Sequence, residues 1–230
     1  MKLLKSLICF SVIGFCTLSL ADVTTPTYIR YGHHPFYIGG LLGYGSTDWS
    51  HLTANCGNDA VCQSDVQASV PTSAGDSGAT VGLTMGYEVQ PHFAFETSFV
   101  RYPTTKVTFT MQEYYTANYP QLFNPDGSGS FNSYTYAFDF IGKFMVGIMD
   151  TSIRAFADAG MAVTYRTDPM NSFSRVNPTF GVGLDYVFAE HWMVDGEFQY
   201  IAGYAKSNTT PAVTYSPFLY SLNMVLAYRF

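Results

Sequence analysis

Charged residues are scarce in this chain of 230 residues. Asp, Glu, Lys and Arg together make up 12% of the sequence, about half of their usual share in soluble globular domains. Basic residues are rarer than acidic ones: the chain has 11 Lys and Arg and 17 Asp and Glu, which gives a formal net charge of −6. An acidic chain does not attract phosphate backbones, so we expect no nucleic acid among its partners.

Long apolar runs are also missing, except at the N-terminus. There, Lys2 and Lys5 precede an apolar run over residues 7–20. The run ends in Ser19-Leu20-Ala21, which puts small residues at the two positions that a signal peptidase reads. We therefore expect residues 1–21 to be a cleaved signal peptide. Its removal takes away two lysines and no acid, so the mature chain has 9 basic and 17 acidic residues and a formal charge of −8.

Two alternatives to a cleaved signal peptide fit the N-terminus less well. A lipoprotein could be anchored through Cys16, but the bulky Phe15 stands where that signal requires a small residue. An uncleaved membrane helix would need a longer apolar run than this one.

Cysteine is rare, and only Cys56 and Cys62 of the four cysteines follow the expected cleavage site. An exported chain meets an oxidising compartment, so this even pair is expected to form a disulfide that closes a small loop. The alternative is a metal clip, for which two thiols with only His51 nearby make a poor ligand set.

Sequence signatures of catalysis are absent. The chain has no Gly-x-Ser-x-Gly, phosphate-binding loop, His-Glu-x-x-His or Cys-x-x-Cys. We therefore predict that the protein is not an enzyme and that it holds no cofactor and no metal.

What the chain does have is strict alternation of apolar and polar residues, most clearly at its C-terminus. One face of the last ten residues carries Leu222, Met224, Leu226, Tyr228 and Phe230, and the other carries Asn223, Val225, Ala227 and Arg229. Because side chains on a strand alternate between two faces, this pattern is typical of a membrane-barrel strand. Leu226, Tyr228 and Phe230 resemble the C-terminal signal that the barrel-assembly machinery of bacterial outer membranes recognises.

The same alternation predicts eight strands, separated by connections that are short and long in turn. The expected strands cover residues 36–46, 79–89, 93–102, 132–146, 152–166, 175–188, 192–204 and 217–230. Connections 90–92, 147–151 and 189–191 are short, whereas 47–78, 103–131, 167–174 and 205–216 are longer. Short inner turns and long outer loops indicate an all-β, eight-stranded antiparallel up-and-down transmembrane β-barrel over residues 36–230. Both termini are then periplasmic, with residues 22–35 as an N-terminal periplasmic segment.

A soluble β-sandwich would also alternate and is the main structural alternative. It would hide its apolar face and display its charges. In this chain the polar face consists mainly of Gly, Thr and Ala, as a crowded barrel interior requires.

Several segments, taken in order, resemble one family of bacterial proteins. They are Phe36-Tyr37-Ile38-Gly39-Gly40-Leu41-Leu42-Gly43-Tyr44, Met85-Gly86-Tyr87-Glu88-Val89-Gln90-Pro91-His92-Phe93-Ala94-Phe95-Glu96, Ala157-Asp158-Ala159-Gly160-Met161, Gly181-Val182-Gly183-Leu184-Asp185-Tyr186 and Tyr228-Arg229-Phe230. The chain thereby resembles the small outer-membrane barrels of the OmpA transmembrane-domain and opacity-protein superfamily. The resemblance implies an eight-stranded barrel used for envelope integrity, surface interaction or limited permeation. Because the chain ends at the last strand, we expect no separate peptidoglycan-binding domain.

Alternation places an unusual set of charges on the inner face of the barrel. These residues are Glu96, Asp139, Lys143, Arg154, Asp158, Asp185, Asp195, Glu197 and Arg229. Glu96 and Lys143 look like the family's inward acid and base on strands three and four, which form part of an ion-pair network that can act as a gate. The simpler interpretation is a polar plug that keeps the barrel closed. Six acids against three bases leave an excess, so the acids must be protonated or share the lumen with cations and water.

The outer loops are the candidate interaction surface. Loop one, 47–78, is acidic and carries the expected disulfide, and loop two, 103–131, is rich in aromatic residues. Aromatic rings give contact area at low entropic cost, so the interaction candidates in loop two are Tyr114, Tyr115, Tyr119 and Phe123. Alternatively, Val107, Phe109 and Met111 keep the outward phase of the preceding strand and merely extend it above the bilayer.

Three functions are therefore considered. The first is an outer-membrane structural and surface-interaction protein, with adhesion or envelope integrity as its role. Its partners would be outer-membrane lipids, the barrel-assembly machinery and an extracellular or host-surface ligand. The second is a small cation-preferring or apolar-solute pore. The third, a lipid-modifying or proteolytic barrel enzyme, would have to use His51, the one histidine in an expected outer loop.

Overall fold

A computed structural model describes most of the region expected to form the barrel. The described residues are 34–49, 73–110, 118, 120–122, 124–125, 128–148, 151–204 and 215–230. Several predictions lie outside them: the signal peptide 1–21, residues 22–33, the pair Cys56 and Cys62, His51, and the loop candidates Tyr114, Tyr115, Tyr119 and Phe123. Among the described residues, no helix is long and apolar enough to cross a bilayer.

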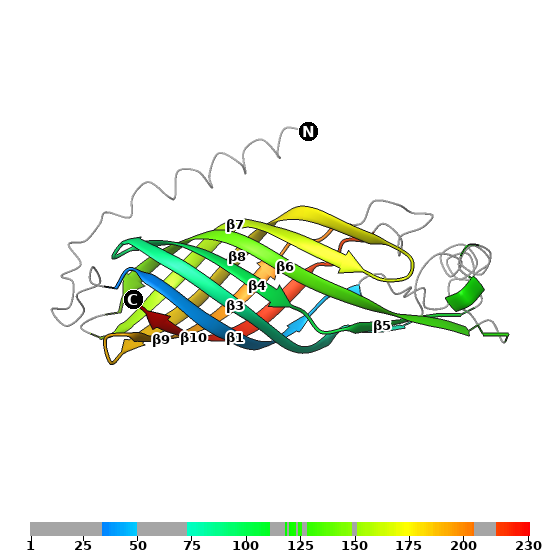
Figure 1. The fold of residues 1–230 in the computed structure, drawn as a ribbon, viewed down its shortest axis with the longest axis horizontal. Coiled ribbons are helices and arrows are strands. Elements are labelled where there is room, and N and C mark those ends of the chain that lie inside the picture. Colours follow the sequence, from blue (N-terminus) through cyan, green and yellow to red (C-terminus); the bar gives the residue numbers. More distant parts are fainter. Residues whose placement is uncertain are drawn as a thin grey trace, which may run out of the picture.

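Eight antiparallel strands close into a barrel, as predicted (Figure 1). The strands are β1 (Phe36–Ser46), β3 (Ser77–Gln90), β4 (Phe93–Arg101), β6 (Ser128–Gly147), β7 (Ile153–Thr167), β8 (Ser172–Phe188), β9 (Trp192–Ile201) and β10 (Leu219–Arg229). Each strand pairs with the next of these along the chain, and β10 returns to pair with β1. Two short strands, β2 (Ser73–Gly75) and β5 (Thr105–Thr110), and a 3-10 turn, η2 (Pro120–Leu122), belong to the long connections.

The distribution of polarity in the barrel is the reverse of that in a soluble protein. On β10, Leu222, Met224 and Leu226 are 50–64% exposed on the outside, whereas the alternate Asn223 and Arg229 are buried. The other strands repeat this pattern, so large apolar side chains cover the outer face and charged ones fill the interior. Such an outer face requires hydrocarbon around it, which excludes the soluble β-sandwich and fits a transmembrane barrel.

One end of the barrel carries the short connections and the described chain ends. The connections are residues 91–92, 148–152 and 189–191, close to the predicted ones, and the C-terminus lies at the same end (Figure 1). The turn between β8 and β9 is tight, with Ala189 and Glu190 at positive φ angles of 48° and 62°. The backbone nitrogen of Phe230 donates to the Phe36 carbonyl oxygen at 2.8 Å, which holds the two ends of the barrel chain side by side.

The opposite end differs from the prediction most clearly in two places. The connection between β7 and β8 is only residues 168–171, shorter than the predicted 167–174, because pairing continues to Thr167 and Ser172. Loop two is partly a hairpin, in which β5 pairs with the first six residues of β6 and β2 pairs with β5. In Figure 1, β5 and this part of β6 project beyond the other strands.

The hairpin also corrects the predicted phase of loop two. In the alternative interpretation of loop two, Val107 continues the outward phase of β4, but its side chain is fully buried. The reason is a break in the strand at residues 102–104, after which inward positions are odd-numbered instead of even-numbered. Pro103 lies in this break, where its missing backbone N–H cannot continue a ladder.

Candidate functional site: the lumen network and the capped mouth

The interior near the short turns holds two arginines and two acids, which we call the inner cluster: Glu88, Arg154, Asp185 and Arg229. Arg154 Nη2 lies 2.9 Å from Glu88 Oε1, and Arg154 Nε lies 2.7 Å from Asp185 Oδ1. Arg229 Nη2 reaches the other Glu88 oxygen at 2.6 Å and donates to the His34 carbonyl oxygen at 3.1 Å. The inner cluster thereby ties β3, β7, β8 and β10 together, and its formal charges balance.

Glu88 is the member of this cluster that the predicted charge network omitted. The alternation of β3 places Glu88 on the inward face together with Thr80 and Thr84, and it is only 5% exposed. It lies at a register shift between β3 and β4, and its two carboxylate oxygens each accept from one arginine. The alternation alone was therefore a sufficient signal to include it.

A second set of charges, the middle cluster, consists of Glu96, Asp139, Lys143, Asp158, Asp195 and Glu197. Lys143 Nζ contacts Asp195 Oδ2 on β9 and lies 3.4 Å from Glu96 Oε2 on β4. The Tyr37 hydroxyl donates to the same Glu96 oxygen at 2.6 Å. Because β7 and β8 lie between β6 and β9 in the sheet, the Lys143–Asp195 pair bridges the lumen.

Asp139 is held by three hydrogen bonds within the middle cluster. It accepts from the Ser98 backbone nitrogen at 3.0 Å, from Ser98 Oγ at 2.6 Å and from Gln199 Nε2 at 2.8 Å. Asp158 and Glu197 are different, because both Asp158 carboxylate oxygens and Glu197 Oε1 are buried without a hydrogen-bond partner. All nine charged residues predicted from the sequence lie in the interior, none more than 6% exposed.

The mouth opposite the short turns is covered by an apolar cap that the sequence did not predict. It consists of Trp49, Val107, Phe131, Met170 and Tyr215, all at most 7% exposed, and each of the four connections at that end contributes to it. Arg166, at the end of β7, stacks its guanidinium 4.4 Å from the Trp49 ring and donates to the Tyr215 carbonyl oxygen at 2.7 Å. Its partners lie up to 117 residues away in the sequence, so no local pattern pointed to this group.

Arg166, which contacts the cap, is also paired with an acid. Arg166 Nε lies 2.5 Å from Asp168 Oδ2 in the β7–β8 turn. The other Asp168 oxygen accepts from the backbone nitrogens of Met170 and Asn171, each at 3.0 Å. These bonds fix the short turn and place Met170 in the cap.

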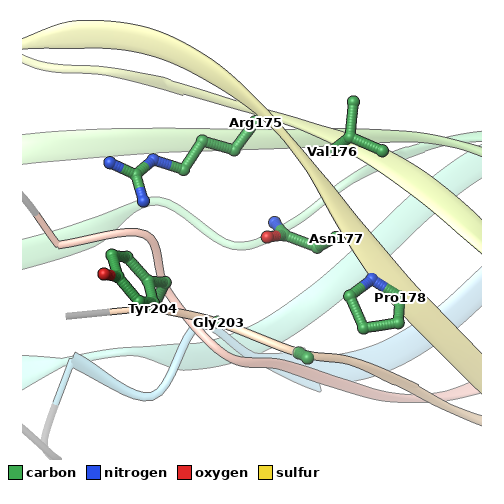
Figure 2. Close-up of a pocket in the computed structure, with 7 residues that line it drawn as sticks. Arg175, Val176, Asn177, Pro178, Gly203 and Tyr204 are labelled. Atoms are coloured by element: carbon green, nitrogen blue, oxygen red, sulfur yellow. The ribbon is translucent and has the colours of Figure 1, made fainter. Parts of the chain in front are cut away.

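The barrel wall has an open pocket near its capped end, between β8 and the segment after β9 (Figure 2). Its volume is about 590 Å³, and its lining includes Arg175, Val176, Pro178, Gly203 and Tyr204. The last residue pair between β8 and β9 is Thr179 with Ile201, so β8 runs on toward Ser172 without β9 beside it. Figure 2 shows the Arg175 side chain extending toward the Tyr204 ring, whose centroid lies 4.9 Å from the guanidinium carbon.

The predicted assembly signal lies on the outer face of β10 at the end with the short turns. Tyr228 contacts Phe230 and Trp192 with ring centroids 5.0 and 5.2 Å apart, and Phe36 lies 5.8 Å from Phe230. Leu226 is further from the strand end and half exposed on the outer face. The aromatic side chains thus form a belt of the kind found at a membrane interface.

These groups connect the walls of the barrel and cover one of its mouths. The buried ion pairs bridge opposite walls, and the cap covers the mouth. Within the described part of the chain, no three His, Cys, Asp or Glu residues are grouped so that they could hold a metal ion.

Comparison with known proteins gives one family and several similar folds. Residues 10–230 match the outer membrane protein beta-barrel domain family. An uncharacterised protein of Coxiella burnetii (strain RSA 493 / Nine Mile phase I) is 23% identical over 219 residues, which is 85% of each chain. Among solved structures, the outer membrane protein OprG from Pseudomonas aeruginosa is similar with a TM-score of 0.51 and 13% identity, over 86% of this chain and 96% of that one. Neisserial surface protein A is similar with a TM-score of 0.50 and 11% identity, over 85% and 97%.

Proposed function

This chain belongs to the outer membrane protein β-barrel domain family, and on that premise we propose that it is a closed barrel that presents its outer loops to partners at the cell surface. The observation that carries this proposal is the filled interior. The inner cluster, the middle cluster and the apolar cap follow one another along the barrel, and their side chains are almost completely buried. An eight-stranded barrel filled in this way has little room for a solute, which leaves the loops as the part that can act.

The hairpin of β5 and β6 is the element best placed to meet a partner. β6 is 20 residues long, whereas a transmembrane strand needs roughly 9–11 residues. Along its outer face, the apolar side chains end at Tyr134, and the next two outward residues are the exposed Asn132 and Ser130. The hairpin therefore leaves the apolar zone and extends into water.

This proposal includes an orientation and a domain arrangement. The hairpin end faces the outside of the cell, the end with the short turns faces the periplasm, and both termini are periplasmic. Residues 1–21 are a cleaved signal peptide, 22–35 form a periplasmic segment, and 36–230 form the barrel. The proposed ligand is an extracellular or host-surface molecule that contacts loop two, where Tyr114, Tyr115, Tyr119 and Phe123 remain the predicted contact residues.

The test is deletion of residues 111–127 with insertion of the two-residue turn Asn-Gly in their place, which closes the β5–β6 hairpin after its last pair, Thr110 with Ser128, and removes the natural connection. Cells that display the intact barrel are expected to bind at least one protein of a panel of extracellular-matrix proteins, and cells with the deleted form are expected to lose that binding. Heat-modifiable migration in gels verifies that the deleted barrel has folded. Equal binding by the two forms would contradict a role for loop two.

A second candidate, passage of an apolar solute, is supported by the wall pocket in Figure 2. Exposed Val176 and Pro178 flank this pocket on the outer face, so an apolar molecule would reach it from the bilayer. Transfer of an apolar dye into vesicles that contain the barrel, undiminished after the deletion of 111–127, would favour this candidate over surface interaction. We do not propose an enzyme, because no described histidine lies at the outer end of the barrel.

A further inference from the structure

The excess of acid in the lumen is confined to the middle of the barrel. The inner cluster has two acids and two arginines, so its formal charge is zero. The middle cluster has five acids, Glu96, Asp139, Asp158, Asp195 and Glu197, against Lys143 alone, which is a formal charge of −4. All five acids are at most 6% exposed. Buried charges need partners, so this part of the lumen requires compensation that the described side chains do not supply.

Two acids of the middle cluster lack a partner that would compensate their charge. Lys143 lies directly opposite Asp158 in the β6–β7 register, yet its ammonium group reaches Glu96 and Asp195 instead. Asp139 is satisfied by Ser98 and Gln199. Asp158 and Glu197 are left with buried oxygens that have no partner.

These unpartnered oxygens converge on the space above Gly181 of β8. Gly181 pairs with Asp158 of β7 on one side and with Gln199 of β9 on the other. Glu197 is the next inward-facing residue of β9 after Gln199. The point where a Cβ atom of residue 181 would stand is 2.5 and 2.7 Å from the two Asp158 oxygens and 2.6 Å from Glu197 Oε1. Only a residue without a side chain leaves this space open. Gln199 Oε1 is also buried without a partner.

We infer that the space beside Gly181 is a binding site for a hard divalent cation, with Asp158 and Glu197 as its protein ligands. The donors are all oxygen atoms and two of the side chains are anionic, which favours cations such as Ca²⁺ over metals that prefer nitrogen or sulfur. Ca²⁺ fits best, because it accepts a flexible set of carboxylate, amide and water oxygens at about 2.3–2.6 Å. Two carboxylates are few for such an ion, so water completes its coordination. The bound ion offsets part of the charge in the middle cluster and links β7 to β9 across β8.

This site is independent of the proposed surface function, and refolding tests it directly. The purified chain is refolded in detergent with either Ca²⁺ or a chelator and then desalted, and its calcium content is measured by elemental analysis. We expect equimolar calcium after refolding with Ca²⁺ and a higher midpoint of thermal unfolding than after refolding with the chelator. Na⁺ at equal ionic strength should not reproduce this increase.

Three substitutions and one control distinguish a site from general charge screening. Asp158→Asn and Glu197→Gln each remove one ligand and should lose most of the retained calcium. Gly181→Ala keeps both carboxylates but puts a methyl group into the space between them, so it should also lose calcium. Glu190→Gln removes one exposed acid from the β8–β9 turn and should retain calcium like the wild type.

Several outcomes would overturn the inference. One is a wild-type barrel that retains no calcium and unfolds at the same temperature with and without Ca²⁺. Another is full retention by Asp158→Asn and Glu197→Gln. If either of these two variants unfolds at a higher temperature than the wild type while the wild type retains no calcium, the two carboxylates share a proton and the cation site is wrong.

Discussion

At the scale of single residues, the position of a side chain across the barrel wall decides its role. Alternate positions of β10 show this, because Leu226 faces outward and is half exposed while Arg229 faces inward and is 2% exposed. A charged side chain is stable inside only because a residue on another strand pairs with it. Glu88 is such a partner for Arg154 and Arg229. The effect of a substitution therefore depends on whether the position faces the lipid or the lumen as much as on the chemistry of the new side chain.

Glu88→Gln is predicted to destabilise the barrel strongly. It removes the carboxylate that pairs with both Arg154 and Arg229, while the Arg154–Asp185 pair remains. Loss of one partner of a buried ion pair costs about 3–5 kcal/mol. Urea titration of the barrel refolded in vesicles measures this loss, and Glu190→Gln, an exposed acid in a turn, is the control. Equal stability of the two variants would show that the inner cluster contributes little.

At the scale of elements, β10 has two separable features: its lipid-facing row and its terminal aromatic residues. Leu222, Met224 and Leu226 form the apolar row, and Tyr228 and Phe230 join the aromatic belt at the strand end. The row interacts with hydrocarbon. The terminal residues are proposed to serve as the signal for the assembly machinery.

Leu226→Arg and deletion of Phe230 are predicted to fail at different stages. Arginine on the lipid face, away from the interfaces, costs roughly 2–4 kcal/mol, so Leu226→Arg should refold poorly in vesicles. Deletion of Phe230 removes one interfacial ring and should refold nearly as the wild type does. In cells, however, the deletion should accumulate in the periplasm and be degraded. Equal refolding defects in the two variants would mean that Phe230 acts through packing alone.

At the scale of the whole molecule, three successive groups close the lumen. The inner cluster joins β3, β7, β8 and β10, and the middle cluster joins β4, β6 and β9. The apolar cap joins the connections at the end opposite the short turns. Because these groups act in series, opening one of them should leave the lumen closed.

The wild-type barrel is therefore predicted to show negligible conductance in planar bilayers, and Trp49→Ala alone should not change this. The double variant Trp49→Ala with Lys143→Ala removes the cap's central ring and the lysine that bridges β6 to β9. It should pass a small current that prefers cations, because the carboxylates of the middle cluster remain. Large and stable current steps in the wild type would instead favour the cation-pore hypothesis.

The sequence by itself determined the number of strands, their inward and outward faces and the closed antiparallel order. These features follow from a local rule, because neighbouring side chains on a strand point to opposite faces and one face must meet hydrocarbon. The interior position of Glu96, Asp139 and Lys143 follows from the same rule, and so does that of Glu88, which the predicted network omitted.

Only the tertiary structure decided which of these side chains meet. Lys143 contacts Asp195, 52 residues away, and leaves its register neighbour Asp158 unpaired, because distances across the lumen depend on closure of the barrel and the stagger of its strands. The inward turn of Val107 after the break at residues 102–104 and the gathering of Trp49, Met170 and Tyr215 into one cap likewise depend on where four separate connections lie in space. Alternation has a period of two residues and carries no information on contacts between distant segments, so these sites are determined by the fold as a whole.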